Sequence, residues 1–229
     1  MRTEHSSCVI TIDGPAGAGK STVAKNLARE LQYSYLDTGA MYRALTLKAI
    51  RTGCDLTDET ALVRCAQATA IELRCVPALG LRVFLDGEDV SEDVRTAVVT
   101  NNTFYIARAP AVREILVGWQ RKMGRSQNVV VEGRDVGTVV FPEATFKFYL
   151  DADFEERVQR RFKELADKGV HVDGARLRAE LQERDQKDLS RAVGPLRRAD
   201  DAVVIDSTRL SIDAVVEKML GIIRSWQAV

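Results

Sequence analysis

The chain has 229 residues, of which 45% are hydrophobic and 29% are charged, a composition typical of a globular protein with a sizeable core. Its 33 basic and 33 acidic side chains balance, so it lacks the excess positive charge of domains that coat nucleic acids. No apolar run approaches the ~18 residues of a membrane helix, and the opening stretch 1–7 is too polar for a signal peptide. We therefore expect a cytoplasmic protein with no nucleic-acid partner and no membrane partner.

The four cysteines provide no obvious metal site or disulfide framework. None belongs to a Cys-x-x-Cys pair, and both histidines lie far from them in the sequence. Because free cysteine behaves as a small hydrophobic residue, we expect the four to be buried in strands and helices. They are Cys8, Cys54, Cys65 and Cys75.

The chain begins with two strand-then-helix patterns. A β-branched run at 9–12 precedes a glycine-rich turn, and apolar residues then recur at every fourth position from Lys20 onward. A second apolar run at 33–36 precedes a helical pattern at 41–50, which Gly53 closes. The sequence predicts a βαβα beginning.

The spacing of apolar residues changes between residues 54 and 109. Thr57 is placed to cap a short helix, and apolar residues then alternate with polar ones at 71–75 and 81–85. The Asp-Gly pair at 86–87 favours a hairpin turn, since glycine adopts positive φ readily. We expect a small antiparallel insertion over 54–109.

After residue 110 the alternation of strands and helices returns. Asp153 and Glu156 are spaced as a capping box at the start of one of these helices. Alternating β and α elements predict an α/β fold with a parallel sheet covered by helices on both faces. The expected elements are a helix at 112–123, strands at 129–131 and 146–150, a helix from 154, a further helix to about 190, a strand at 203–205 and a helix at 212–223.

Residues 14–21 read Gly-Pro-Ala-Gly-Ala-Gly-Lys-Ser and match the phosphate-binding pattern G-x-x-x-x-G-K-[ST] between a strand and a helix. Backbone N–H groups and the positive end of the helix bind polyphosphate in such a loop. We expect Lys20 to reach the β- and γ-phosphates and Ser21 to place its hydroxyl on Mg²⁺. The expected ATP-binding residues are Gly14, Pro15, Ala16, Gly17, Ala18, Gly19, Lys20, Ser21 and Thr22.

A phosphate loop alone is shared by phosphotransferases, GTPase switches and ATPase motors. The guanine-reading pattern N-K-x-D is absent from the sequence, which weakens the switch hypothesis. Asp13, just before the loop, has two equally supported roles: holding a water bound to Mg²⁺, or stabilising the turn through its own side chain.

A second anion site is indicated by arginine, which outnumbers lysine 24 to 9 and forms planar, bidentate contacts with phosphate. Two arginine-bearing segments, 37–43 and 132–142, follow predicted strands, where open α/β sheets bind ligands. The third, 184–191, places Arg184, Asp188 and Arg191 on one helical face. A simple ion pair between Arg184 and Asp188 is the alternative to a ligand-binding role.

Together with the phosphate loop, the segments D-T-G-A-M-Y-R at 37–43, G-R-D-V-G-T-V-V-F-P at 133–142 and R-D-x-x-D-x-x-R at 184–191 resemble bacterial cytidylate kinases, and the resemblance covers essentially the whole chain. It implies transfer of the γ-phosphoryl group of ATP, with Mg²⁺, to CMP or dCMP. It also implies a P-loop kinase fold with a core at 1–53 and 110–229, an inserted nucleotide-monophosphate domain at 54–109 and a short helical lid at about 157–174. We expect a monomer.

The resemblance also assigns residues by position. Those matching the CMP site are Thr38, Arg43, Arg113, Arg134, Asp135, Arg184, Asp188 and Arg191. Among them, Arg43, Arg134 and Arg184 match the clamp on the CMP phosphate, Asp188 and Arg191 match contacts to the sugar and the phosphates, and Arg113 with Asp135 match the cytosine contacts.

The proposed catalytic groups are Lys20, Arg134, Arg184, Arg157 and Arg161, and no general base is required, because an acceptor phosphate is already an anion. Arg157 and Arg161 resemble lid arginines that fold over ATP, although a surface helix paired with acidic neighbours such as Glu164 is almost as well supported.

One position departs from the family pattern. Phe104 stands where the family has a small hydroxyl residue near cytosine, so either the adjacent Thr103 substitutes or the contact is lost. The alternative functions are a UMP/CMP, dTMP or other small-molecule kinase on the same scaffold and, in another class, a noncatalytic nucleotide sensor or GTPase-like switch.

Overall fold

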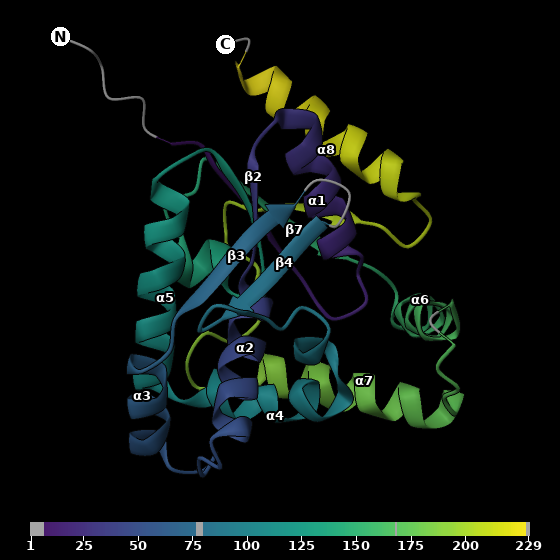
Figure 1. Cartoon of the computed structure of the whole chain (residues 1–229). Helices are drawn as coiled ribbons and strands as arrows, with labels where there is room; N and C mark the ends of the chain where they lie inside the picture. Colours follow the sequence, from purple (N-terminus) through teal and green to yellow (C-terminus); the bar gives the residue numbers. More distant parts are fainter. Residues whose placement is uncertain (1–6, 77–79, 168, 228–229) are drawn as a thin grey trace, which may run out of the picture. The chain divides into compact units, whose positions relative to one another are not determined.

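The computed structural model in Figure 1 describes residues 7–76, 80–167 and 169–227. The expectation about the polar opening stretch falls almost entirely on residues 1–6, outside the described ones. By their packing the described residues divide into two compact units, one within 34–129 and the other within 8–33 and 130–227. Within the described ranges no helix has the length and apolar character needed to cross a bilayer.

The second unit is built on a sheet whose strands follow the order β6-β1-β7-β8. Strand β1 pairs in parallel with β7, and β7 pairs in parallel with β8. Every residue of β1 and β6 is buried, as strands covered on both faces require. The predicted α/β class with a parallel sheet is confirmed. The strands are β1 (Val9–Asp13), β6 (Val129–Glu132), β7 (Phe146–Asp151) and β8 (Val203–Asp206).

In the part of this unit that the structure describes, there are four α-helices and one π-helix, and α1 and α8 pack against each other (Figure 1). Val23, Leu27 and Ala28 give α1 a buried stripe at the predicted helical spacing. The π-helix over 136–140 is not predicted by the sequence pattern. The helices are α1 (Lys20–Leu31), η2 (Val136–Val140), α6 (Phe154–Asp167), α7 (Gly174–Leu189) and α8 (Ile212–Gln227).

Of the capping box predicted at the start of α6, the structure contains the Asp153 cap but not the reciprocal contact of Glu156. Asp153 Oδ1 accepts hydrogen bonds from the backbone N–H groups of Glu155 at 2.9 Å and Glu156 at 3.4 Å, so Asp153 caps the helix. The Glu156 side chain instead accepts from Arg160 Nε at 2.9 Å, because an ion pair one turn along the helix is within its reach.

The first unit contains the predicted antiparallel sheet, in which β3 pairs with β4 and β4 with β5. Asp86 and Gly87 have φ values of 51° and 86°, as the predicted Asp-Gly hairpin turn requires, and this confirms it. The elements are β2 (Ser34–Asp37), α2 (Thr38–Arg51), α3 (Glu59–Gln67), β3 (Ile71–Val76), β4 (Gly80–Leu85), β5 (Glu88–Asp89), the 3-10 helix η1 (Asp93–Arg95), α4 (Ala97–Arg108) and α5 (Pro110–Arg125).

Two local features of this unit differ from what the sequence pattern predicts. The cap of α3 is Asp58, whose Oδ1 accepts from Thr60 N at 2.8 Å, whereas the Thr57 hydroxyl donates to Asp55 at 2.7 Å. The insertion at 54–109 also contains helix α4, which the sequence pattern did not predict beside the antiparallel strands. The β-branched and aromatic residues of α4 have weak helical propensity, and packing against α2 stabilises the helix.

Packing groups α2 and α5 with the segment 54–109, since α2 contacts β4 and α5 contacts α3 and α4. The compact unit therefore includes more residues than the inserted domain at 54–109 that the resemblance implies. The boundary of that functional domain stays a prediction.

The prediction that the cysteines are buried is wrong. All four cysteines lie within the described residues, and none of them forms a disulfide. Cys75 is exposed and the other three are half-buried. Cys75 lies near the end of β3, where the strand is largely exposed and the predicted core position is therefore lost.

Candidate active site

The phosphate loop over 14–21 depends on glycine for its shape and its packing. Gly14 has a φ of 148° and Gly17 a φ of 79°, in the region that other residues adopt rarely. A Cβ atom on Gly14 would lie 2.0 Å from the carbonyl oxygen of Leu150 at the end of β7. The loop is therefore pressed against the neighbouring strand, and a side chain at Gly14 would force the two apart.

Ser207, just after β8, supports the loop from the C-terminal part of the chain. Its hydroxyl lies 3.2 Å from the carbonyl oxygen of Ala18 and 2.9 Å from that of Asp151, and its N–H donates to Asp151 O at 2.8 Å. No pattern in the sequence identified Ser207, because its partners are backbone atoms of distant segments.

Lys20 is buried at the start of α1, and its Nζ donates to the carbonyl oxygen of Pro15 at 2.6 Å. Burial lowers its pKa to about 7, and the positive charges of Arg134 and Arg184 act in the same direction, while Glu132 acts against them. The next two residues, Ser21 and Thr22, are exposed in the first turn of α1. The loop thus presents a cationic group beside accessible hydroxyls.

An arginine-carboxylate cluster stands near Lys20 in the same unit. Arg134 Nε donates to Asp188 Oδ2 at 2.8 Å, and Arg191 Nη2 donates to Asp188 Oδ1 at 3.1 Å. Burial alone would raise the pKa of Asp188, but Arg134, Arg191 and Arg184 outweigh it and hold that pKa below its usual value. The structure therefore brings Arg134, Arg184, Asp188 and Arg191 together in the electrostatic neighbourhood of Lys20.

Asp13 links the end of β1 to the π-helix η2. Its Oδ1 accepts from Val136 N at 2.8 Å and its Oδ2 from Gly137 N at 2.7 Å, so both oxygens bind backbone far along the chain. Burial raises the pKa of Asp13 to about 6, although the two N–H groups lower it. Asp135, which precedes η2, is also buried. Asp13 thereby fixes the segment that carries Asp135.

The two predicted lid arginines have different surroundings. Arg157 is buried and donates to Ala152 O at 3.1 Å and to Ala16 O in the phosphate loop at 2.9 Å. Arg161 Nη1 instead lies 2.7 Å from Glu164 Oε2 on the surface of α6. The alternative of a surface ion pair thus describes Arg161 in this structure, whereas Arg157 contacts the loop.

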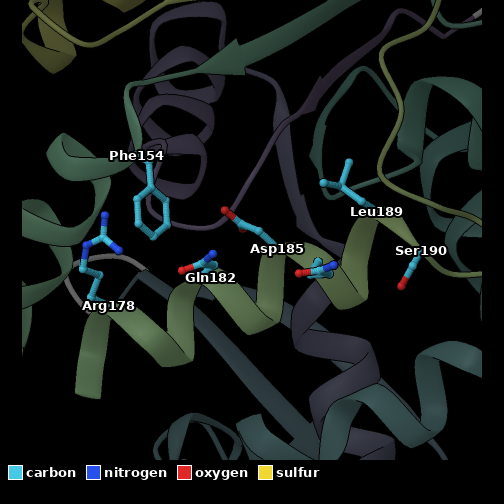
Figure 2. Close-up of a pocket in the computed structure, with 7 residues that line it drawn as sticks. Phe154, Arg178, Gln182, Asp185, Leu189 and Ser190 are labelled. Carbon is cyan, nitrogen blue, oxygen red and sulfur yellow. The ribbon is translucent and has the colours of Figure 1, made fainter. Parts of the chain in front are cut away.

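Asp185 is a residue of this site to which the sequence analysis gave no role. It lies inside the R-D-x-x-D-x-x-R segment and binds Arg157 and Ala16. Figure 2 shows its side chain projecting from α7 on the same side as Phe154, along a pocket of about 560 Å³. The pocket is lined by Phe154, Arg178, Gln182, Asp185, Gln186, Leu189 and Ser190, none of which the sequence analysis predicted to bind substrate.

The remaining predicted substrate residues belong to the first unit. Thr38 is buried at the start of α2, and the preceding Asp37 accepts from Ala40 N at 2.9 Å and from Arg43 Nη2 at 3.0 Å. Arg113 is buried in α5, and its guanidinium carbon lies 5.7 Å from the centre of the Tyr42 ring. Asp37 and Tyr42 stand within the predicted 37–43 segment without having been given a role.

The departure at Phe104 lies on α4. The hydroxyl of Thr103 donates to Val99 O at 2.8 Å, one helical turn back, so its proton is directed into its own helix. The Phe104 ring packs edge-on against Tyr105 and lies under the guanidinium of Arg108 at 5.4 Å. A hydroxyl contact to a nucleobase from Thr103 would require its oxygen to act as an acceptor.

A family model and similar curated relatives indicate one family. A family model described as cytidylate kinase matches residues 10–225. A cytidylate kinase of Pelotomaculum thermopropionicum is 51% identical over 212 residues, covering 93% of this chain and 94% of its own length, and one of Citrobacter koseri is 50% identical over 213 residues, covering 93% of each chain. A solved gluconokinase of Sinorhizobium meliloti is similar in fold alone, with a TM-score of 0.50, 13% identity and coverage of 97% of this chain and 98% of its own.

Proposed function

Because the chain belongs to the cytidylate kinase family, it transfers the γ-phosphoryl group of ATP to CMP or dCMP, and we propose that the side chains gathered around Lys20 carry out this transfer. The observation that supports this assignment most strongly is that a buried lysine at the end of a glycine loop shares its electrostatic environment with Arg134, Arg184 and Asp188. Two anionic substrates meeting at one place need such a concentration of positive charge.

The donor phosphates are proposed to lie against residues 14–22, where backbone N–H groups of the loop stand at the positive end of α1. Lys20 would exchange its hydrogen bond with Pro15 O for one with a β- or γ-phosphate oxygen. Because the polyphosphate is strongly negative, its arrival would restore the proton that burial and two arginines disfavour on Lys20.

Mg²⁺ fits the residues present, with Ser21 as the proposed protein ligand. The Ser21 residue is exposed, whereas both oxygens of Asp13 already accept backbone hydrogen bonds. Within the described residues no cluster of three or more His, Cys, Asp or Glu side chains could enclose a metal, which suits an ion held largely by substrate oxygens and water. When bound, the ion would neutralise phosphate charge.

For the acceptor, we assign the CMP phosphate to Arg43, Arg134 and Arg184, the residues that match the phosphate clamp of the family. Asp188 and Arg191 are proposed to contact the sugar and the phosphates. The acceptor oxygen is already anionic, so alignment and charge neutralisation supply the catalysis without a general base. Arg157 and Arg161 are proposed to stabilise the charge on the transferring group from the lid at about 157–174.

Cytosine is proposed to be read by Asp135 and Arg113. The exocyclic N4 amino group of cytosine is a donor suited to a carboxylate, whereas N3 and O2 are acceptors suited to a guanidinium. Uracil presents an oxygen where cytosine has the amino group, so UMP would place an acceptor against the carboxylate. The segment 54–109 is proposed as the inserted acceptor domain, in a cytoplasmic monomer that binds no nucleic acid.

A panel of acceptors tests this proposal. With ATP as donor, ADP release is measured for CMP, dCMP, UMP and dTMP, and CMP and dCMP are expected to give the highest kcat/KM. Equal rates with UMP would contradict the cytosine assignment. Tight GTP binding without acceptor-dependent turnover would instead support a nucleotide sensor.

A further inference from the structure

Arg157 is a buried cation whose charge is balanced by one carboxylate. Its side chain is 9% exposed, that of Asp185 is 13% exposed, and Arg157 Nη1 lies 2.5 Å from Asp185 Oδ2. A buried guanidinium left without a counter-ion is strongly unfavourable. The position of Arg157 therefore depends on a residue 28 positions later, on the next helix.

The same pair holds one residue of the phosphate loop at both of its backbone polar groups. Asp185 Oδ1 accepts from Ala16 N at 3.4 Å, and Arg157 Nη1 donates to Ala16 O at 2.9 Å. Gly17 is also covered, since a Cβ there would lie 3.1 Å from Arg157 Cβ. The two peptide planes flanking Ala16 are thus fixed by side chains of α6 and α7.

Further contacts restrict the movement of Arg157. Its Nε donates to Ala152 O at 3.1 Å, and its guanidinium carbon lies 5.2 Å from the centre of the Phe154 ring. Arg178 lies 5.0 Å from the same ring and is itself paired with Glu155. Figure 2 shows Phe154, Arg178 and Asp185 along one pocket, with the Asp185 carboxylate projecting beside the ring.

We propose that Asp185 is a positioning residue for the donor nucleotide. By fixing Arg157 and the Ala16 N–H, it holds the turn from Pro15 to Gly17 in the conformation that presents the loop to the ATP phosphates. This proposal rests on the donor assignment made above. It gives Asp185 no contact with CMP.

Substituting Asp185 should therefore affect ATP and spare CMP. In Asp185→Asn we expect the Kd for ATP, measured by calorimetry without acceptor, to rise about tenfold, because a charge-assisted contact is lost. The KM for CMP at saturating ATP should stay within about twofold. Amide hydrogen exchange of the loop peptide in the ligand-free protein should become faster, reporting the loop directly.

Glu183→Gln is the matched control on the same helix. Glu183 forms an exposed i,i+4 ion pair with Lys187 at 2.6 Å and has no contact with the loop in the described structure, so this variant should match the wild type in every measurement. Asp185→Glu provides a second test in case Asp185→Asn does not fold. It keeps the buried charge but displaces the carboxylate, and about threefold weaker ATP binding is expected with CMP unaffected.

Unchanged ATP affinity and loop exchange in the folded Asp185 variants would overturn the proposal, as would equal losses for ATP and CMP. Tighter ATP binding would also overturn it, because the carboxylate would then be competing with phosphate for Arg157 and Ala16. Turnover of the wild-type protein distinguishes failure of the Asp185 proposal from failure of the proposed function. An absence of CMP-dependent turnover there contradicts the function, while the ATP-binding comparison still decides the role of Asp185.

Discussion

Arg134 and Asp188 are 54 residues apart in the sequence, yet Arg134 Nε donates to Asp188 Oδ2 at 2.8 Å and both side chains are less than one-fifth exposed. Asp188 also accepts a hydrogen bond from Arg191, so one carboxylate orients two guanidinium groups. Such preorganisation lowers the entropic cost of binding a second phosphate anion.

Arg134→Ala is expected to raise the KM for CMP by roughly 30-fold or more, with a smaller effect on the KM for ATP, since a charged contact to the acceptor phosphate is removed. Initial rates measured while each substrate is varied in turn test this. Arg176→Ala is the control, because Arg176 is an exposed arginine on α7 paired with Glu180. Equal changes in both KM values would contradict the division between donor and acceptor sites.

Lys20→Ala is expected to lower kcat by about 10³-fold or more while leaving the fold intact, because the amine stabilises charge on the transferring phosphoryl group. The protein should not lose stability through the lost charge, since burial of Lys20 already disfavours its protonated form. Turnover and circular dichroism are measured on the same preparation. Unimpaired turnover in a folded variant would contradict the phosphate-loop assignment.

ATP binding is expected to be coupled to proton uptake at Lys20. With its pKa lowered to about 7 by burial, Lys20 is mostly neutral at pH 8, and a bound polyphosphate is expected to raise that pKa. Uptake should therefore approach one proton at about pH 8 and vanish near pH 6. Calorimetry in buffers of different ionisation enthalpy measures it, with Lys20→Arg as a comparison that stays charged. Identical uptake in both proteins would rule out Lys20 as the acceptor of the proton.

Asp13 should make stability depend on pH in the acidic range. Its pKa is raised from 3.8 to about 6 by burial, so the folded state binds the proton more tightly than the unfolded state. The free energy of unfolding contributed by this group therefore falls as the pH rises from about 4 to about 6, by roughly 3 kcal/mol, and stays constant above that range. Urea denaturation of the wild type and Asp13→Asn over this range gives the difference. The free energy of unfolding of the wild type minus that of Asp13→Asn should fall as the pH rises. A difference that stays constant or increases with pH would contradict this explanation.

The phosphate loop could be predicted from the sequence because the residues of its motif are local. Strand, glycines, lysine and helix follow one another within about 25 residues, and the positive φ of Gly14 restricts that position to glycine. The Asp-Gly turn at 86–87 was predictable for the same reason.

The features that escaped prediction depend on distant partners. Helix α4 is stabilised by packing on α2, the π-helix η2 is held by Asp13, and Asp185 is identified by its contacts with Arg157 and Ala16. Periodicity and spacing carry no information about such partners. Within the R-D-x-x-D-x-x-R segment, spacing placed Asp188 on one helical face with Arg184 and Arg191, but it gave no sign that Asp185 contacts Arg157 and the phosphate loop.

The contact between Ser207 and Ala18 has a consequence for how the protein is made. The ribosome synthesises the phosphate loop well before Leu150, Arg157 and Ser207, which hold it in place. During translation the nascent loop is therefore a glycine-rich stretch without its supports. A chain truncated before β8 would carry the complete nucleotide-binding motif and lack the contacts that shape it.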